Sequence, residues 1–471
     1  MKNIFTLLRS ALRRLTPWHW FLVFSLLFIQ FESQRFNNWR HSINKSPFVD
    51  DAEQYYAYLP ATFIYHHLDF QFPNGYWCVA GKNGKRVPKY TFGVALLETP
   101  FFIAGHTAAR LLDYPLTGYS EPYSRAACGA VLCYVFLGLF CLYKALIRYV
   151  DPRAAALTLF ILFYATNLFY YSVSFPLMSH AFSFSMFSVF VYAWIRCIKD
   201  RHLPSLFLAS AAAGMIVLIR PPDLLLLLFP LLMGISDFRA WKEGWFFLFR
   251  KKGYLALSAL FFLLLCFLQP LYWYLITDTW FINGYDGERF FFRDPQVINF
   301  LFSCRKGLIP YAPVMIFSLL GFIALYRRCR ELFWPVLGFT VINVYVLSCW
   351  WDWTFGGSLG NRALIQSFAL LAFPLAALIH ACATCFRTVR ARLYSYAGMF
   401  AVACFFVVFN LSLVHKYRSG VIHWDDMNKQ AYWYMLPKWD LTPDELREES
   451  KLWKPMNPAE FKKGIGRDDK P

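Results

Sequence analysis

Two adjacent carboxylates, Asp50 and Asp51, are the residues of this sequence best suited to do chemistry. Neighbouring acids repel each other, which raises the proton affinity of one of them toward the range of a general base. Asp50 also begins the pattern of a helix capping box with Glu53 at the third helical position, and that role is purely structural. Asp51 is therefore the stronger candidate for a catalytic base, with Asp50 as the second.

The segment that follows the acids is predicted to be an amphipathic helix over 51–67. Pro60 removes one backbone donor and should kink it. Its tyrosines are typical of anchors at a membrane boundary, and one of them, Tyr55, is also a candidate substrate-binding residue. These residues follow a first apolar run that begins near Trp18, so the acids are expected just beyond a membrane span.

The composition is that of an integral membrane protein. Hydrophobic residues make up 58% of the chain and charged residues 16%, against roughly 25% charged in soluble domains. The formal charge of +18 would suggest nucleic acid as a partner in a soluble protein. Here many of the cations form short clusters between apolar runs, as the positive-inside rule requires. We therefore expect membrane lipids as partners and no nucleic acid.

The predicted fold is all-α and has about eleven spans. Each is close in length to the roughly 20 residues that a helix needs to cross a bilayer. They are expected near 18–31, 124–146, 154–172, 180–196, 204–219, 222–236, 254–277, 308–326, 332–350, 362–382 and 393–413. The segment Tyr90–Leu112 is long enough to span, but if it did, every basic cluster would face outward. We therefore predict a membrane-surface or re-entrant helix there. The N-terminus is then cytoplasmic, and the tail from His415 lies outside.

An acidic pair after the first span, the surface helix around Tyr56–Ala61, a second one at Lys89-Tyr-Thr-Phe-Gly93 and a long series of spans resemble the GT-C superfamily of polytopic glycosyltransferases. The protein O-mannosyltransferase and aminoarabinose-transferase branch is the most similar. The resemblance implies a catalytic membrane module over 1–280 with an outer loop 32–123. C-terminal transmembrane helices over 281–414, with outer loops 278–307 and 351–361, and an extracytoplasmic tail 415–471 complete the expected organisation.

The resemblance also implies an activity: inverting transfer of a sugar from a polyprenyl-phosphate donor to a glycan, lipid or protein acceptor. An aspartate of the first loop activates the acceptor, and the location is the bacterial inner membrane with a periplasmic active site. A leaving phosphate at the membrane surface needs fixed cations. The candidates are Lys89, Arg220, Arg305, Lys306 and Arg362.

His180 stands at the outer start of a span where several GT-C relatives carry a second acid. It is either a helix-end packing residue or a hydrogen-bond donor to the phosphate or the acceptor. Asp51 and His180 could together hold a divalent cation, but two ligands make a weak metal site. No cofactor is therefore predicted with certainty.

Two other classes of function remain open at this stage. A transporter or flippase of a lipid-linked saccharide would also need outer cations and aromatic residues, but it should bury ionisable residues in mid-span within broken helices. A non-catalytic membrane scaffold would not need acids, cations and tryptophans on one face. An enzyme requires Asp51, His180, Arg220, Arg305 and Arg362 to converge at one site.

Overall fold

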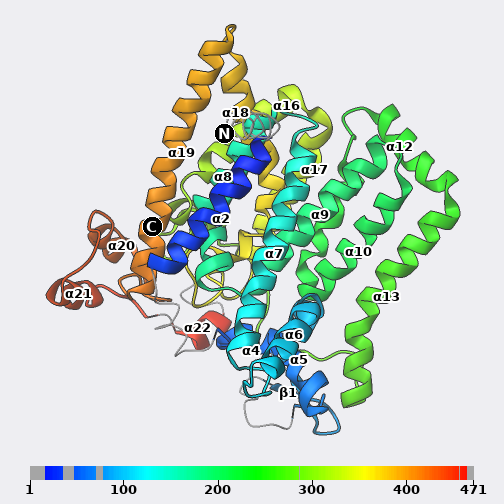
Figure 1. Ribbon diagram of the computed structural model, residues 1–471, viewed down its shortest axis with the longest axis vertical. Coiled ribbons are helices and arrows are strands. Elements are labelled where there is room, and N and C mark those ends of the chain that lie inside the picture. Colours follow the sequence, from blue (N-terminus) through cyan, green and yellow to red (C-terminus); the bar gives the residue numbers. More distant parts are fainter. Residues whose placement is uncertain (1–15, 36–46, 71–77, 286, 456, 464–471) are drawn as a thin grey trace, which may run out of the picture.

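The computed structural model describes residues 16–35, 47–70, 78–285, 287–455 and 457–463. The protein is 70% helical, and its helices run alongside one another in a bundle (Figure 1). The one sheet of the described residues is a two-stranded antiparallel ribbon, β1 (Cys78–Ala80) with β2 (Arg86–Pro88), in which Val79 lies opposite Val87. The all-helical fold predicted from the sequence is confirmed.

Within the described ranges, five helices are long and apolar enough to cross a membrane. They are α7 (Glu121–Leu146), α9 (Ser179–Lys199), α13 (Lys252–Thr277), α17 (Arg330–Ser348) and α19 (Val389–Arg418). Shorter apolar helices join them: α2 (Pro17–Arg35), α8 (Pro152–Tyr164), α10 (Leu203–Ile219), η3 with α11 (Pro221–Leu227 and Leu228–Leu232) and α18 (Phe368–Thr384). Most of the predicted spans thus correspond to these elements. The span predicted near 308–326 corresponds to two helices, α15 (Leu308–Tyr311) and α16 (Met315–Arg328).

Helix α9 forms the centre of the bundle and α13 its periphery. Over the most apolar 18-residue stretch of each helix, 83% of the residues of α9 are buried, against 11% of those of α13. A Cβ on Gly138 of α7 would lie 2.7 Å from the Cα of Ser185, so α7 and α9 pack backbone to backbone. With 21 residues, α9 is long enough to hold its first residues and its last at opposite ends of the bundle.

The basic turns of the chain meet at one of these two ends. Arg148, after α7, pairs with Asp200, and Lys199 at the end of α9 pairs with Glu331 at the start of α17. Arg328 donates to the hydroxyl of Thr384 at the end of α18, 2.8 Å away. This arrangement agrees with the topology inferred from charge, in which these clusters share one side of the membrane.

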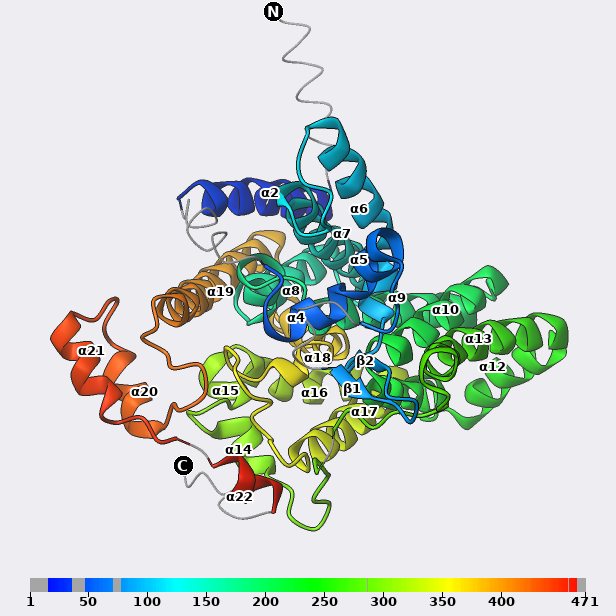
Figure 2. The same cartoon turned by 90° about the horizontal axis from the view of Figure 1, so that it is seen from below.

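The first loop gathers at the other end of the bundle (Figures 1 and 2). It comprises α4 (Asp50–Tyr56), α5 (Tyr58–Pro60), the π-helix η1 (Ala61–Tyr65), the β ribbon and α6 (Gly93–Leu111). The helix predicted over 51–67 is therefore divided, and its geometry changes at Pro60 as the missing donor requires. Helix α6, from the ambiguous segment, is not among the candidate spans of the described chain.

Short helices complete the chain at the site end and in the tail. They are η2 (Tyr170–Ser174), α14 (Val297–Phe302), η4 (Arg362–Leu364), α20 (Lys429–Met435), α21 (Pro443–Ser450) and α22 (Pro458–Lys462). Helix α21 begins with a complete capping box between Thr442 and Glu445. The described residues after Thr442 are therefore mostly helical.

Helix α12 (Phe238–Arg250) lies between two of the predicted spans and was not expected from the sequence. Asp237 caps its start by accepting from the backbone N–H groups of Arg239 and Ala240, both at 3.1 Å. Its cations and aromatic residues alternate, so no continuous apolar run marks it as a span.

Candidate active site

Asp51 is held by two contacts, one on each carboxylate oxygen. The Tyr90 hydroxyl donates to Oδ1 at 2.8 Å, and the Arg362 guanidinium lies 3.1 Å from Oδ2. The first turn of α4, the loop before α6 and the start of η4 supply these three side chains. Each oxygen keeps a second lone-pair position, so the carboxylate could still accept a proton from a bound molecule.

The charge of Asp51 and the burial of Arg362 act on the pKa of Arg362 in opposite directions. Burial by itself would lower the pKa of Arg362, but the charge of Asp51, assisted by the surrounding tyrosines, outweighs burial and raises the pKa. The pKa of Tyr90 is raised well above its ordinary value by burial and then by Asp51. Tyr90 therefore stays protonated at neutral pH and keeps donating to Asp51.

Tyr55 lies among the charged groups of this site. It stacks on Tyr90 with ring centroids 4.7 Å apart. Burial and then Asp51 raise the pKa of Tyr55 to about 12, while Arg220 and Arg362 act in the opposite direction. Tyr55, the predicted substrate contact, is thus near enough to both Asp51 and Arg220 for their charges to act on it.

A second polar group surrounds Arg220 at the end of α10. Its guanidinium donates to the His180 ring at the start of α9, and its Nε lies 4.0 Å from the carboxylate of Asp223. Gln366 donates to the other oxygen of Asp223 at 3.0 Å. The break between α10 and η3 therefore places a cation, predicted from the Arg-Pro-Pro sequence, at the same end as Asp51.

Lys89 borders the site through the loop between α13 and α14. It pairs with Glu288 at 3.0 Å and its Nζ lies 4.2 Å from the ring centroid of Tyr285. Trp351 donates its indole N–H to the same Glu288, also at 3.0 Å. These contacts join the predicted outer loops 278–307 and 351–361 on one side of the site.

Arg305 and Lys306 are buried and bind backbone carbonyls. Arg305 donates to Asp425 O at 3.1 Å and to Lys454 O at 3.0 Å, while Lys306 donates to Ser358 O and Trp424 O. Both cations therefore bind the tail, and Lys306 also connects it to the loop before η4. Lys306 is near enough to Arg362 for that charge to contribute to lowering its pKa, after burial, to about 7.

Asp50 is exposed and the expected capping box does not form. The N-cap of α4 is Val49, without a side-chain cap, and Asp50 has a left-handed φ of 53°. Such a backbone does not match the extended conformation of an N-cap. Burial and then Asp50 raise the pKa of Glu53. Asp50 thus affects the pKa of Glu53 in the first turn of α4, and it does not share the contacts of Asp51 with Tyr90 and Arg362.

Two residues near the site were not identified from the sequence. In the sequence, Tyr90 was predicted only as part of a surface helix, and Asp352 only as part of the outer loop 351–361. Burial raises the pKa of Asp352, with its hydrogen bonds to Thr354 and the charge of Arg362 acting against it. An acid flanked by tryptophans on both sides was the available signal, because such a position is seldom exposed.

A cation site is not formed by side chains alone in the described part of the chain. No group of three or more His, Cys, Asp or Glu residues there could hold a metal ion. Arg362 pairs with one oxygen of Asp51, and His180 contacts Arg220. The chemistry available from these residues is proton acceptance by Asp51 and anion binding by the cations.

No family model matches the sequence, and no curated protein matches it. Solved structures similar to the fold include ArnT from Cupriavidus metallidurans in the apo state. Its identity is 14% and its TM-score 0.42, with 88% of this chain and 71% of that chain covered.

The archaeal oligosaccharyltransferase AglB from Archaeoglobus fulgidus, in complex with an inhibitory peptide and a dolichol-phosphate, is also similar. Here the identity is 14% and the TM-score 0.49, with 96% of this chain covered. The chain spans 61% of that AglB chain, and 54% of another AglB structure with Zn and sulfate at 15% identity and a TM-score of 0.46.

Proposed function

We propose that this protein is a glycosyltransferase that moves a sugar from a polyprenyl-phosphate donor to an acceptor, with Asp51 as the general base. The observation that carries the proposal is the position of Asp51 between Tyr90 and Arg362, 2.8 Å and 3.1 Å away. A carboxylate fixed on both oxygens is preorganised, and such positioning is what proton abstraction requires.

In the proposed reaction, Asp51 takes the proton of an acceptor hydroxyl or amine as that group attacks the anomeric carbon. The bond from this carbon to the phosphate oxygen breaks, and polyprenyl phosphate leaves with the bonding electrons. A glycosidic or N-glycosyl bond forms to the acceptor. Tyr90 positions the carboxylate, because it donates to Oδ1 and remains protonated.

Arg220 and Arg362 are the proposed partners of the departing phosphate. Arginine offers five N–H donors in a planar fork that matches phosphate oxygens, and Arg220 uses only part of this set for His180 and Asp223. Lys89 stands at the border, paired with Glu288. Arg305 and Lys306 contribute positive charge nearby while they hold the tail.

The proposed side of the membrane follows from charge. The basic turns lie together at the end of the bundle opposite Asp51, and the positive-inside rule assigns that end to the cytoplasm. The site and the tail are then on the outer side. The inner membrane, with a periplasmic site, is the location that the resemblance to the GT-C superfamily implies. A lipid-linked donor would reach the site from the outer leaflet.

The proposal is tested by mass analysis of glycolipids and glycoproteins from cells lacking the gene. We expect one sugar-bearing species to disappear and the wild-type gene to restore it. With the Arg220→Gln gene, the restored product should be at least about 100-fold below the wild-type level. Arg110 is an exposed cation of α6, and the Arg110→Gln gene should restore the product fully. An unchanged profile in the deletion strain would contradict a role in glycosylation.

A second measurement separates an enzyme from a transporter of lipid-linked saccharides. Purified protein in detergent has no compartments to connect, so only an enzyme forms product there from donor lipid and the acceptor found in the deletion strain. Formation of the glycosylated acceptor supports the proposal. Loss of the species in cells without any transfer in detergent would favour the transporter.

A further inference from the structure

Helix α12, at the end of the bundle opposite Asp51, has a surface that the proposed reaction does not use. Gly244 and Leu248 face the protein, while the rings of Phe238, Phe246 and Phe249 are 57%, 57% and 56% exposed. An exposed apolar helix face next to a set of spanning helices fits the interfacial zone of a bilayer.

Cations line the edge of this aromatic face. The Lys242 Nζ lies 4.5 Å from the Phe238 ring centroid, and the Arg250 guanidinium lies 4.4 Å from the Phe246 centroid. Each pair sets a positive charge beside an apolar ring, so that the ring can enter the acyl region while the charge stays at headgroup level. Lys251 and Lys252 follow at the junction with α13.

The charge of this segment is unbalanced. Between 237 and 252 the sequence has five cations, Arg239, Lys242, Arg250, Lys251 and Lys252, against the acids Asp237 and Glu243. Asp237 accepts from the backbone at the helix start, and Glu243 lies 3.4 Å from Arg239. The remaining positive charge favours an anionic surface over a zwitterionic one.

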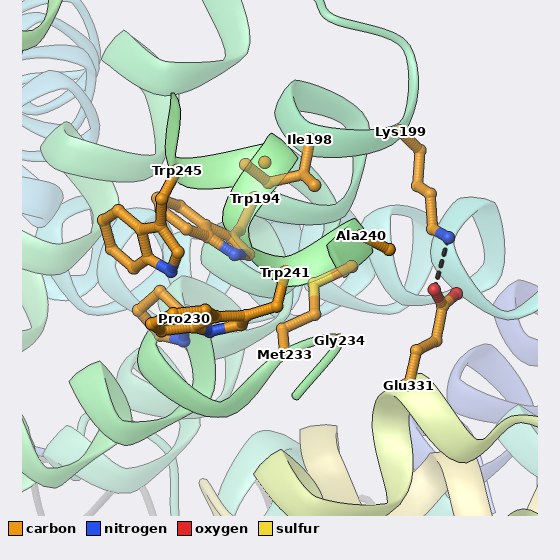
Figure 3. A pocket seen from close by; sticks show the side chains of 11 residues that line it. Trp194, Ile198, Lys199, Pro230, Met233, Gly234, Ala240, Trp241, Trp245 and Glu331 are labelled. Carbon is orange, nitrogen blue, oxygen red and sulfur yellow. Dashed lines mark hydrogen bonds and ion pairs between the residues drawn. The ribbon is translucent and has the colours of Figure 1, made fainter. Parts of the chain in front are cut away.

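A pocket opens behind α12, between it and helices α9, α11 and α17 (Figure 3). Its walls include the rings of Trp194, Trp241 and Trp245, and the ion pair of Lys199 with Glu331 lies at its side. Trp194 is 7% exposed, and its indole N–H has no hydrogen-bond partner in the described structure. An unpartnered buried donor in a pocket calls for an acceptor oxygen.

We propose that α12 and this tryptophan pocket form a binding site for an anionic phospholipid of the leaflet at the basic end. The headgroup phosphate binds the cations along α12, the acyl chains cover the exposed phenylalanines, and an ester or phosphate oxygen accepts from Trp194. An anionic lipid satisfies all three observations together, because it combines apolar chains, negative charge and acceptor oxygens.

The test uses the full-length protein in detergent, with phosphatidylglycerol or phosphatidylcholine added in steps and the melting temperature recorded. A ligand of the folded state raises that temperature, so we expect a larger rise with phosphatidylglycerol, reduced by added salt. Native mass spectrometry should show retained phosphatidylglycerol. Equal rises with the two lipids would overturn the proposal.

Variants locate the site. Lys242→Gln with Arg250→Gln should need about 30-fold more phosphatidylglycerol for the same rise, since each of the two cations near a lipid surface contributes about 1 kcal/mol. Trp194→Phe keeps the ring and loses the donor, and should need about fivefold more.

The matched control is Lys144→Gln with Arg390→Gln, two exposed cations outside α12, which should respond like the wild type. A Lys242/Arg250 variant that responds like this control would place the lipid elsewhere and overturn the proposal.

Discussion

The two ends of the bundle contain the same kinds of charged residue in opposite settings. Around Asp51, the cations Arg362, Arg305 and Lys306 are largely buried and bound to fixed acceptors. At the other end, Arg239, Arg250 and Arg390 are exposed. Buried cations near a carboxylate can bind an anion specifically, whereas exposed ones set topology and attract lipid. Substitutions should therefore have strong effects at the first end and weak ones at the second.

The largest difference is expected between two arginines. Arg362→Gln removes the partner of Asp51 and a candidate phosphate contact, and should lower transfer by about 100-fold or more. Arg390→Gln, at the basic end, should change transfer by less than about twofold. Product formation by both purified variants measures this contrast, and equal rates would remove the distinction between the ends.

Lys306→Met should loosen the tail from the site end. Its Nζ donates to two buried carbonyls, and leaving buried acceptors unpaired costs about 2 kcal/mol. Hydrogen exchange over 421–455 should become faster by about 30-fold. Lys451→Met, whose side chain is 67% exposed, is the matched control, and similar exchange in the two variants would contradict the anchoring role.

Tyr90→Phe tests a positioning role. Removing the hydroxyl that donates to Asp51 should reduce kcat by about tenfold, because a hydrogen bond to a charged group contributes about 1.5 kcal/mol. KM for the donor should change little, as Tyr90 positions the base. A changed KM with an unchanged kcat would instead assign Tyr90 to substrate binding.

Glu449 makes the tail sensitive to pH. Burial raises its pKa to about 7 from the ordinary 4.5, so the stability it contributes is complete below pH 4.5 and is lost as pH rises through 7. Exchange in α21, corrected for the intrinsic effect of pH, should be slower at pH 5 than at pH 8 by up to about 70-fold. Glu449→Gln should abolish that difference, and Glu460→Gln, an exposed acid, should preserve it.

The sequence predicted much of this architecture because long apolar runs and clustered cations are local signals. It indicated Asp51, Arg220, His180 and Arg362, which the structure places at one end of the bundle. It did not show that Tyr90 donates to Asp51, or that Arg305 and Lys306 bind the tail. These partners are separated by 39, 120 and 118 residues, and spacing carries no information over such distances.

Two local features differ from the expectation, one because of the backbone and the other because of the side-chain pattern. The capping box at Asp50 requires an extended backbone, and the structure has a left-handed φ there. Helix α12 was missed because its exposed face mixes rings with cations, which a search for continuous apolar runs does not detect. Its amphipathic period was present in the sequence and would have indicated an interfacial helix.

Replacement of Asp51 by Asn is the most direct test of the catalytic assignment. In cells lacking the gene, Asp51→Asn should leave the sugar-bearing species at least about 100-fold below the wild-type level, with the protein present in the membrane fraction in normal amount. Asp113→Asn, an exposed acid of the same loop, should restore the species fully. Full restoration by Asp51→Asn would contradict the assignment of Asp51 as the base.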